Sequence, residues 1–255
     1  MNETTLDVVL NELVIANRIL ANEGVVDAYG HVSVRHPSKP ERFFMAGMLA
    51  PELVERGDFM EFGLDGQAIS DSRAPSVERF IHGAIYEARP EVQGVVHAHA
   101  EDVLPFGITD APLQPVIHSG SFIGRTVPVW DIAETFGDTD LLVRDMSQGR
   151  DLARCLGNNN VVLMRGHGFA AAARSLIEVV RISVYLPRNA RVQLAAMHIG
   201  KYKPLSEGEI AARAAGYKPY SVQTWRAWEY WANRAGCGHM LGERPATDAK
   251  KSEDG

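Results

Sequence analysis

The sequence predicts a single α/β domain in which helices flank a mixed, mainly antiparallel β-sheet, with a helical segment at the C-terminus. Its length of 255 residues suits one large domain, and a hydrophobic content of 45% is sufficient to form a full core. Helix-like and strand-like periodicities alternate along the chain without an internal repeat. We therefore expect one domain at residues 1–204, followed by a helical segment and a tail at residues 205–255.

Apolar residues recur every three or four positions over residues 4–22, which predicts an amphipathic helix. The stretches HVSVRH and RFFMAG follow as two strands, and the turn between them contains Pro37 and Pro40. FMEFGLDGQAI predicts a further strand, a tight turn at Asp65–Gly66 and a returning strand. SVERFIHGAIYEA has helical spacing again, and this helix is expected to end before Pro90.

The second half of the chain continues with strands and ends in helices. VQGVVHAHA predicts one strand, and VPVW and NNNVVLMRGHGFAAAA predict two more, before a long helix over Ser175–His198. Trp225, Trp228 and Trp231 recur at three-residue spacing, which is typical of a helix that packs an aromatic stripe on the protein body. Alternatively, this segment covers an active site of its own or a neighbouring subunit. The final TDAKKSEDG is expected to be a frayed tail.

The charge balance and the cysteine content exclude several classes of protein. The formal net charge is −6, with no cluster of Lys and Arg, which argues against a nucleic-acid partner. The N-terminus lacks the pattern of a secretory leader, and no apolar run is long enough to span a membrane. Two cysteines, Cys155 and Cys237, cannot form a disulfide framework. We expect a cytoplasmic protein that binds neither nucleic acid nor a membrane.

Two histidines stand one residue apart in the stretch GVVHAHAEDVLPF. Because residues i and i+2 of a strand point to the same side, the imidazoles of His97 and His99 can bind one metal ion together. Two solvent-facing histidines at a strand end would give the same pattern. Taken alone, this motif is weak evidence for a metal site.

A third histidine and a carboxylate strengthen the metal hypothesis. His167 lies between Gly166 and Gly168 at the end of an apolar run, and glycines allow the backbone to turn sharply and approach closely. Together with His97 and His99 it would complete the three-histidine set of a catalytic metal site. Glu78, one helix before the His97 strand, could be a ligand, a general base, or an acid that the helix dipole favours.

The order of GHVSVR, PSVERFIHGAIYEARPEVQGVVHAHAEDVLPFG and LMRGHGFAAAARSL resembles the class II aldolase/adducin family. The resemblance extends over roughly residues 6–200. It implies that His97, His99 and His167 are ligands of one divalent metal ion per subunit and that Glu78 is the catalytic acid/base. It also implies a nine-stranded, mainly antiparallel sheet and a homotetramer with active sites between subunits. Imidazole ligands suit Mn²⁺, Zn²⁺ and Fe²⁺ alike, so the metal is not identified.

The sequence departs from the sugar-phosphate enzymes of that family where they bind phosphate. The corresponding stretches contain His31 in GHVS, Met45 and Ala46 in FMAGM, and Val77 in PSVE. Phosphate requires several converging N–H and O–H donors, which Met, Ala and Val do not offer. We therefore expect a non-phosphorylated ligand.

A small-molecule carboxylate is the expected substrate. Candidates for binding its carboxylate or hydroxyl groups are His31, Arg35, Arg79 and, from the C-terminal segment, Tyr217.

The same departures resemble a branch of the family that decarboxylates hydroxylated aromatic or pyridine dicarboxylates. Such a reaction leaves electron density that a metal site can stabilise and requires a proton at the ring carbon, for which Glu78 and His118 are the candidate donors. Three alternatives stay open: an aldolase acting on a non-phosphorylated hydroxy-keto acid, a non-haem Fe(II) oxygenase with the same three histidines, and a scaffold without turnover, as in adducin.

Overall fold

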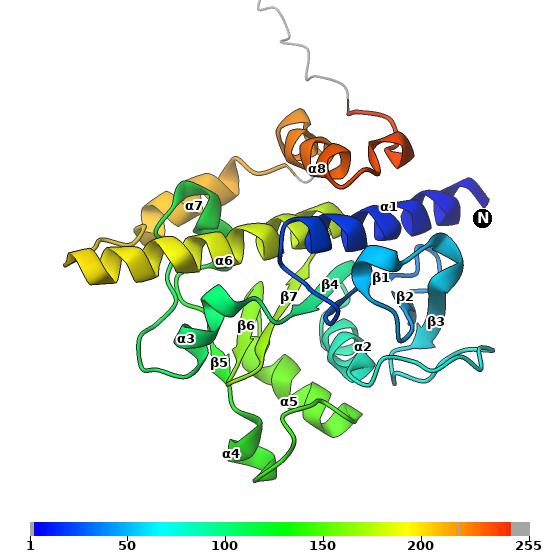
Figure 1. The fold of residues 1–255 in the computed structure, drawn as a ribbon, viewed down its shortest axis with the longest axis horizontal. Helices are drawn as coiled ribbons and strands as arrows, with labels where there is room; N and C mark the ends of the chain where they lie inside the picture. The colour runs from blue at the N-terminus through cyan, green and yellow to red at the C-terminus, as the bar shows by residue number, and fades with distance from the viewer. Residues whose placement is uncertain (1–2, 219, 246–255) are drawn as a thin grey trace, which may run out of the picture.

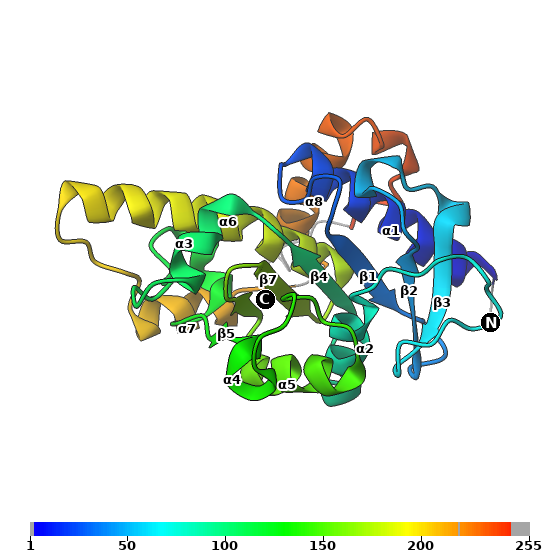
Figure 2. The same cartoon turned by 60° about the horizontal axis from the view of Figure 1, so that its bottom comes forward.

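The computed structural model describes residues 3–218 and 220–245, and these form a seven-stranded sheet with helices on both faces (Figures 1 and 2). The strand order is β3-β2-β1-β4-β7-β6-β5, and every neighbouring pair is antiparallel except β5 and β6. This confirms the predicted fold class. The strands are β1 (His31–Arg35), β2 (Arg42–Ala46), β3 (Phe59–Gly63), β4 (Gly94–Ala98), β5 (Val129–Trp130), β6 (Val161–Met164) and β7 (Gly168–Ala173).

Helices α1 and α6 cover one face of the sheet, with α8 packed on them, and α2 and α5 cover the other face (Figure 1). The predicted helices at 4–22, before Pro90 and at 175–198 are confirmed by α1, α2 and α6. The helices are α1 (Glu3–Asn22), α2 (Arg79–Ala88), α3 (Leu104–Gly107), α4 (Ile132–Phe136), α5 (Met146–Leu156), α6 (Leu176–Ile199), α7 (Glu207–Ala215) and α8 (Val222–Arg234).

The two faces of the sheet form separate apolar cores because side chains alternate along each strand. In β4, Val96 and Ala98 pack in the core under α1 and α6, whereas Val95 packs in the core under α2 and α5. Alternation therefore directs His97 toward the α2 and α5 side, where its side chain is fully buried. The central position of β4 explains why a polar residue of this strand must find its partners inside the protein.

The structure differs from the predicted strands in three places. It contains seven strands in the described residues, where the family resemblance implies nine. The strand expected after the Asp65–Gly66 turn is reduced to one isolated bridge between Phe62 and Ala68, and the extended conformation ends at Ser70, whose φ is 54°. NNNVVLMRGHGFAAAA forms two strands rather than one, because Gly166 adopts a φ of 65° and reverses the chain between β6 and β7.

The predicted aromatic stripe of the C-terminal segment packs on the protein body. Trp225, Trp228 and Trp231 of α8 are buried in the core that α1 and α6 also line, and this confirms the packing interpretation. The boundary near residue 204 stays a prediction, and the stretch TDAKKSEDG lies outside the described residues. Among the described residues, no helix has both the length and the hydropathy of a membrane-spanning segment.

Trp228→Ala should lower the free energy of unfolding by about 3–5 kcal/mol, because it leaves a cavity where a side chain that is 1% exposed now packs. Tyr230→Ala on the same helix is the matched control, since Tyr230 is 58% exposed and its loss should change the stability little. Denaturant unfolding followed by circular dichroism measures both. Equal stabilities of the two variants would contradict the packing of α8 on the main core.

Candidate metal centre

Four side chains from distant parts of the sequence converge beside the end of β4. Glu78 occupies the N-cap position of α2, His97 lies in β4, His99 follows β4 directly, and His167 lies in the turn between β6 and β7. One potential ligand atom from each of these residues lies within 4.8 Å of all the others. The structure therefore brings together the four residues that the sequence singles out as metal ligands and catalytic acid/base.

Glycine and alanine allow these elements to approach one another. A Cβ atom at Gly168 would lie 2.2 Å from the Ala98 carbonyl oxygen, so a larger residue there would push β7 away from β4. On the α2 and α5 side, the direct neighbour of His97 in β7 is Ala170, which leaves room for the imidazole. These small residues explain how His167 reaches the two histidines of the β4 end.

The spacing of the four groups fits a single metal ion. The Nε2 atom of His99 lies 3.0 Å from Nε2 of His97 and 3.1 Å from Nε2 of His167. The Oε2 atom of Glu78 is 3.4 Å from Nε2 of His97 and 3.5 Å from Nε2 of His167. Ligand atoms that each lie about 2.1 Å from one ion are roughly 3–3.4 Å apart, so the observed separations suit a common ion.

Hydrogen bonds on the outer side of the group orient three of these ligands. Nδ1 of His97 lies 3.0 Å from the Phe169 carbonyl oxygen, and Nδ1 of His167 lies 2.9 Å from that of Leu141. A carbonyl oxygen only accepts, so both rings carry their proton on Nδ1 and present the Nε2 lone pair inward. Oε1 of Glu78 accepts a hydrogen bond from the Val143 backbone N–H at 3.0 Å, which leaves Oε2 facing the histidines.

The protonation states of Glu78 and His99 suit metal binding, whereas at His167 the interactions with Glu78 and the Leu141 carbonyl together outweigh burial and raise the pKa. Burial alone would raise the pKa of Glu78, but its interactions with His97 and His167 outweigh burial and hold that pKa well below its usual range. Burial, together with the neighbouring His97 and His167, lowers the pKa of His99 to about 4. An ionised carboxylate and a neutral imidazole are the forms that bind a cation. The donor set therefore fits a divalent metal ion.

His31, a predicted substrate-binding residue, lies beside this group. It is directly opposite His97 in the β1–β4 ladder, and the centroids of the two rings are 5.1 Å apart. His31 also lines a cavity of about 310 Å³, together with Tyr29, Met48 and Ser76. His31 therefore lies beside both His97 and a cavity within one chain, and its role in substrate binding stays a prediction.

The structure gives Arg35 a different role from the predicted contact with substrate. Its Nε donates to the Val92 carbonyl oxygen at 2.8 Å, and its Nη2 donates to those of Tyr86 at 2.9 Å and Arg89 at 3.1 Å. Its Nη1 donates to the Pro40 carbonyl. The buried guanidinium therefore links the C-terminal end of α2 to the end of β1 that is farther from His31.

Arg79 is likewise used within the fold. Its Nε donates to the Gly66 carbonyl at 2.6 Å, its Nη1 donates to that of Ser76 at 3.1 Å, and the guanidinium lies 4.2 Å from the centre of the Phe80 ring. These contacts attach the Asp65–Gly66 turn to the start of α2. A contact of Arg79 with a carboxylate of the substrate stays a prediction.

His118 and Tyr217 do not join the four-residue group within one chain. His118 is exposed at the start of a short 3-10 segment, His118–Ile123, that packs against α6. The Tyr217 ring contacts that of Phe122 in the same segment, at a centroid distance of 5.4 Å. Their predicted roles in proton transfer and substrate binding would require a second subunit, so these two assignments stay predictions.

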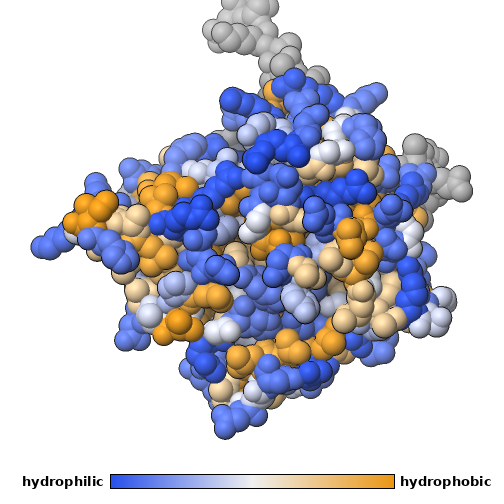
Figure 3. All heavy atoms as spheres, in the orientation of Figure 1, coloured by the Kyte–Doolittle hydropathy of each residue, from blue (hydrophilic) through white to orange (hydrophobic). Residues whose placement is uncertain are grey.

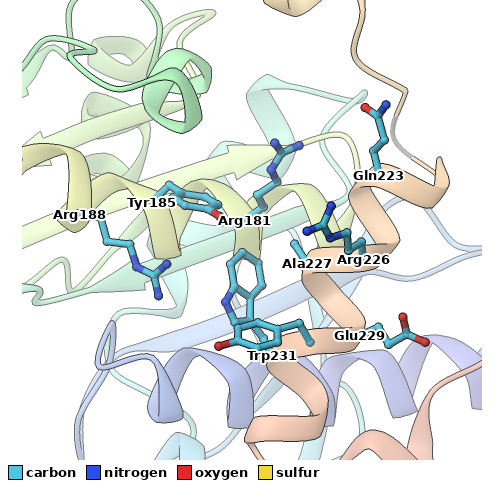
Figure 4. A pocket seen from close by; sticks show the side chains of 9 residues that line it. Arg181, Tyr185, Arg188, Gln223, Arg226, Ala227, Glu229 and Trp231 are labelled. Carbon is cyan, nitrogen blue, oxygen red and sulfur yellow. The ribbon is translucent and has the colours of Figure 1, made fainter.

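A larger cavity lies elsewhere, between α6 and α8, with a volume of about 590 Å³ (Figure 4). Two of its arginines have partners inside the protein. Arg181 lies 4.1 Å from the centre of the Phe122 ring, and Arg188 donates to Glu23 at 2.5 Å. None of the four converging residues lines this cavity. The metal-type group, rather than the larger cavity, therefore defines the candidate active site.

Residues 11–194 match the family model described as Class II Aldolase and Adducin N-terminal domain. The chain belongs to the class II aldolase/adducin family. It is 37% identical over 236 residues to Decarboxylase tropJ of Talaromyces stipitatus, a match covering 82% of this chain and 88% of that protein. It is 25% identical over 233 residues to 3,4-dihydroxyphthalate decarboxylase of Arthrobacter keyseri, covering 84% of this chain and 90% of that protein.

A solved structure supports the same fold. The aldolase II superfamily protein from Pseudomonas syringae superimposes with a TM-score of 0.73 at 23% identity, covering 91% of this chain and 94% of that protein. The family resemblance inferred from the histidine motifs is therefore confirmed, as is the class II aldolase-like fold.

His97→Ala and His167→Ala should each lose tightly bound divalent metal, because each removes one of the converging nitrogen ligands. His118→Ala is the matched control and should keep the wild-type metal content, since His118 lies outside the group. Elemental analysis after dialysis against a weak chelator measures the ratio of metal to protein. Stoichiometric metal in either of the first two variants would contradict the three-histidine assignment.

The contribution of His31 and His99 to the stability of the metal-free protein should fall as the pH falls from about 6.5 toward about 4. Burial and the neighbouring histidines lower the pKa of His31 to about 3 and that of His99 to about 4, from an ordinary value of 6.5. At these two histidines the unfolded chain therefore binds protons in this range that the folded chain does not. Denaturant unfolding at several pH values measures the slope, which His31→Phe should reduce. An unchanged slope in that variant would contradict the prediction.

Proposed function

We propose that this protein is a metal-dependent decarboxylase of a hydroxylated aromatic or pyridine carboxylate. The observation that carries the proposal is the group of Glu78, His97, His99 and His167, whose inward-facing atoms are spaced for one divalent ion. The 37% identity with a protein named a decarboxylase, and the further likeness to 3,4-dihydroxyphthalate decarboxylase, favour loss of CO₂ over the other reactions of the family.

The cavity beside His31 supports a substrate without a phosphate group. Its lining contains no Lys or Arg, and Met48, Leu49 and Ala50 provide an apolar wall. A phosphate dianion is usually held by several cationic side chains or converging N–H groups, whereas the polar side chains of this lining are only Asn17, Tyr29, His31 and Ser76. An aromatic ring can pack on the apolar wall while its polar groups point toward the histidines.

A divalent ion held by the three histidines would supply positive charge that stabilises the electron density left when a carboxylate departs as CO₂. Glu78 can move the proton that the reaction requires. Because its carboxylate is ionised, Oε2 can take the proton of the ring hydroxyl and then deliver it to the ring carbon that has lost CO₂. The bond to the carboxyl carbon breaks, a C–H bond forms, and no oxidant is needed.

The predicted homotetramer with active sites between subunits is part of this proposal. Apolar side chains lie among polar ones at the far end of α6 (Figure 3), where Val192, Met197 and Ile199 are exposed. Burial of such a surface against another subunit would stabilise an assembly. A neighbouring subunit is also the proposed source of contacts from His118 and Tyr217. The proposed substrate is a small carboxylate. We further propose that the protein acts in the cytoplasm and binds neither nucleic acid nor a membrane.

Wild-type protein reconstituted with Mn²⁺, Fe²⁺ or Zn²⁺ should release CO₂ under argon from at least one ortho-hydroxy aromatic or pyridine dicarboxylate. Product formed only in air would instead support the Fe(II) oxygenase. Reversible formation of a keto acid and an aldehyde, without CO₂, would support the aldolase. Measurement of CO₂ and organic products in the same reactions separates the three activities.

In the same assay, Glu78→Gln should keep the fold and the metal but lose turnover by about 10²–10⁴-fold, since an amide cannot carry the proton. Glu87→Gln is the matched control, because Glu87 is exposed on α2 and pairs with Arg150 away from the group. An unchanged kcat in Glu78→Gln would remove Glu78 from the mechanism.

A further inference from the structure

A chain of hydrogen bonds runs from the edge of the metal-type group into the core between β1 and α2. Nδ1 of His31 lies 2.6 Å from Nε2 of His82, and Nδ1 of His82 lies 2.6 Å from Oγ of Ser33. Oγ of Ser33 lies 2.8 Å from the hydroxyl oxygen of Tyr86. His82, Ser33 and Tyr86 are at most 1% exposed, so these groups must satisfy one another.

Regular secondary structure places these four residues in register. His31 and Ser33 are two residues apart on β1, so they share one side of the strand. His82 and Tyr86 are four residues apart on α2, so they share one side of the helix. Strand and helix thus contribute the members of the chain alternately.

The direction of the protons can be worked out from the buried end. Among the hydrogen bonds of the described residues, the one side-chain partner of the Tyr86 hydroxyl is Ser33. If Ser33 donated to Tyr86, the Tyr86 proton would be buried without an acceptor, which costs about 1–3 kcal/mol. Tyr86 therefore donates to Ser33. Ser33, whose remaining partner is His82, must then donate its own proton to Nδ1 of His82.

The same reasoning continues to the metal-type group. A neutral His82 that accepts at Nδ1 carries its proton on Nε2 and donates it to Nδ1 of His31. A neutral His31 that accepts at Nδ1 carries its own proton on Nε2. That nitrogen has no partner among the hydrogen bonds of the described residues, and the His31 side chain lines the cavity next to His97.

We infer that Tyr86, Ser33 and His82 are positioning residues that hold His31 as an Nε2–H donor toward a carboxylate oxygen of the substrate. His31 is then a substrate-binding residue and not a fourth nitrogen ligand, because a protonated Nε2 has no lone pair for a metal ion. The proton order is a property of the protein alone, whereas the contact with a carboxylate rests on the proposed function.

The test is nitrogen-15 NMR of histidine-labelled, zinc-loaded protein, with His31 assigned by its loss in His31→Phe. In the wild type, Nε2 of His31 should be protonated and Nδ1 unprotonated, as one tautomer. Tyr86→Phe and Ser33→Ala should each give a mixture of His31 tautomers, because the proton order is no longer imposed. Tyr185→Phe and Ser183→Ala are matched controls outside the chain and should leave the His31 signals unchanged.

Titration with 2-hydroxybenzoate tests the substrate contact. It should shift the Nε2 signal of His31 in the wild type, and His31→Phe should raise its Kd by roughly tenfold or more, the loss of one hydrogen bond to a charged acceptor. Tyr86→Phe should raise the Kd by about two- to fivefold, since part of the population no longer offers the donor. Elemental analysis should give the wild-type metal content in Tyr86→Phe, Ser33→Ala and His31→Phe.

The outcomes separate the inference from the proposed function. A wild-type His31 protonated on Nδ1, or a Tyr86→Phe variant with unchanged tautomer, would overturn the proton order. The predicted tautomer with no response to 2-hydroxybenzoate would overturn the carboxylate contact. If decarboxylation fails but the tautomer and the 2-hydroxybenzoate response are as expected, the proposed function is overturned. The inferred proton order from Tyr86 to His31 and the carboxylate contact of His31 are then supported.

Discussion

The position of β4 between β1 and β7 is the constraint on which the candidate site depends. Because β4 has a paired strand on both edges and an apolar core on both faces, its polar residues have no access to bulk water. His97 is 0% exposed, and it remains in this position because the Phe169 carbonyl accepts from Nδ1 and the other members of the group face Nε2. At this buried position, an imidazole without hydrogen-bond or metal partners would carry a large free-energy penalty.

Backbone groups hold the site as much as side chains do. The carbonyl that orients His167 belongs to Leu141, whose φ of 65° is unusual for a residue with a large side chain. Two residues later the Val143 N–H donates to Glu78. The segment before α5 therefore fixes both a histidine and the carboxylate, and its strained conformation persists because these bonds and the burial of Val143 determine it.

The sequence identified the parts of the site that follow a local rule. Period-two spacing predicted the pairing of His97 and His99, and the glycines around His167 predicted its close approach. The roles of Arg35 and Arg79 were not predictable in this way, because their partners are backbone carbonyls, which any residue supplies. Ser33 and Tyr86 were missed although their spacings to His31 and His82 are regular, because a single sequence does not show which helix packs on which strand.

The strands show the same limit. Alternation in HVSVRH and apolar runs elsewhere predicted the strands, yet whether NNNVVLMRGHGFAAAA forms one strand or two depends on the conformation of Gly166, and glycine tolerates both. Whether a return strand forms after the Asp65–Gly66 turn depends on how many residues pair with β3. Ser70, which leaves the extended region, limits that pairing, and no periodicity in the sequence marks it.

The role of Arg35 completes an account of how α2 is positioned. His31, Ser33 and Arg35 occupy alternate positions of β1 and all face α2. His31 forms a hydrogen bond with His82, and Ser33 forms hydrogen bonds with His82 and Tyr86. Arg35 binds the carbonyls at the helix end and lies 4.7 Å from the centre of the Tyr86 ring.

This contact between β1 and α2 is therefore a row of hydrogen bonds rather than a purely apolar interface. Each such bond adds only about 0.5–1.5 kcal/mol net, but a shift of the helix along the strand would leave several buried groups unpaired at once. Hydrogen bonding thus fixes the position of α2 more narrowly than apolar packing alone would. Because Glu78 stands at the N-terminus of α2, the row that begins at His31 also sets the distance between the carboxylate and His97.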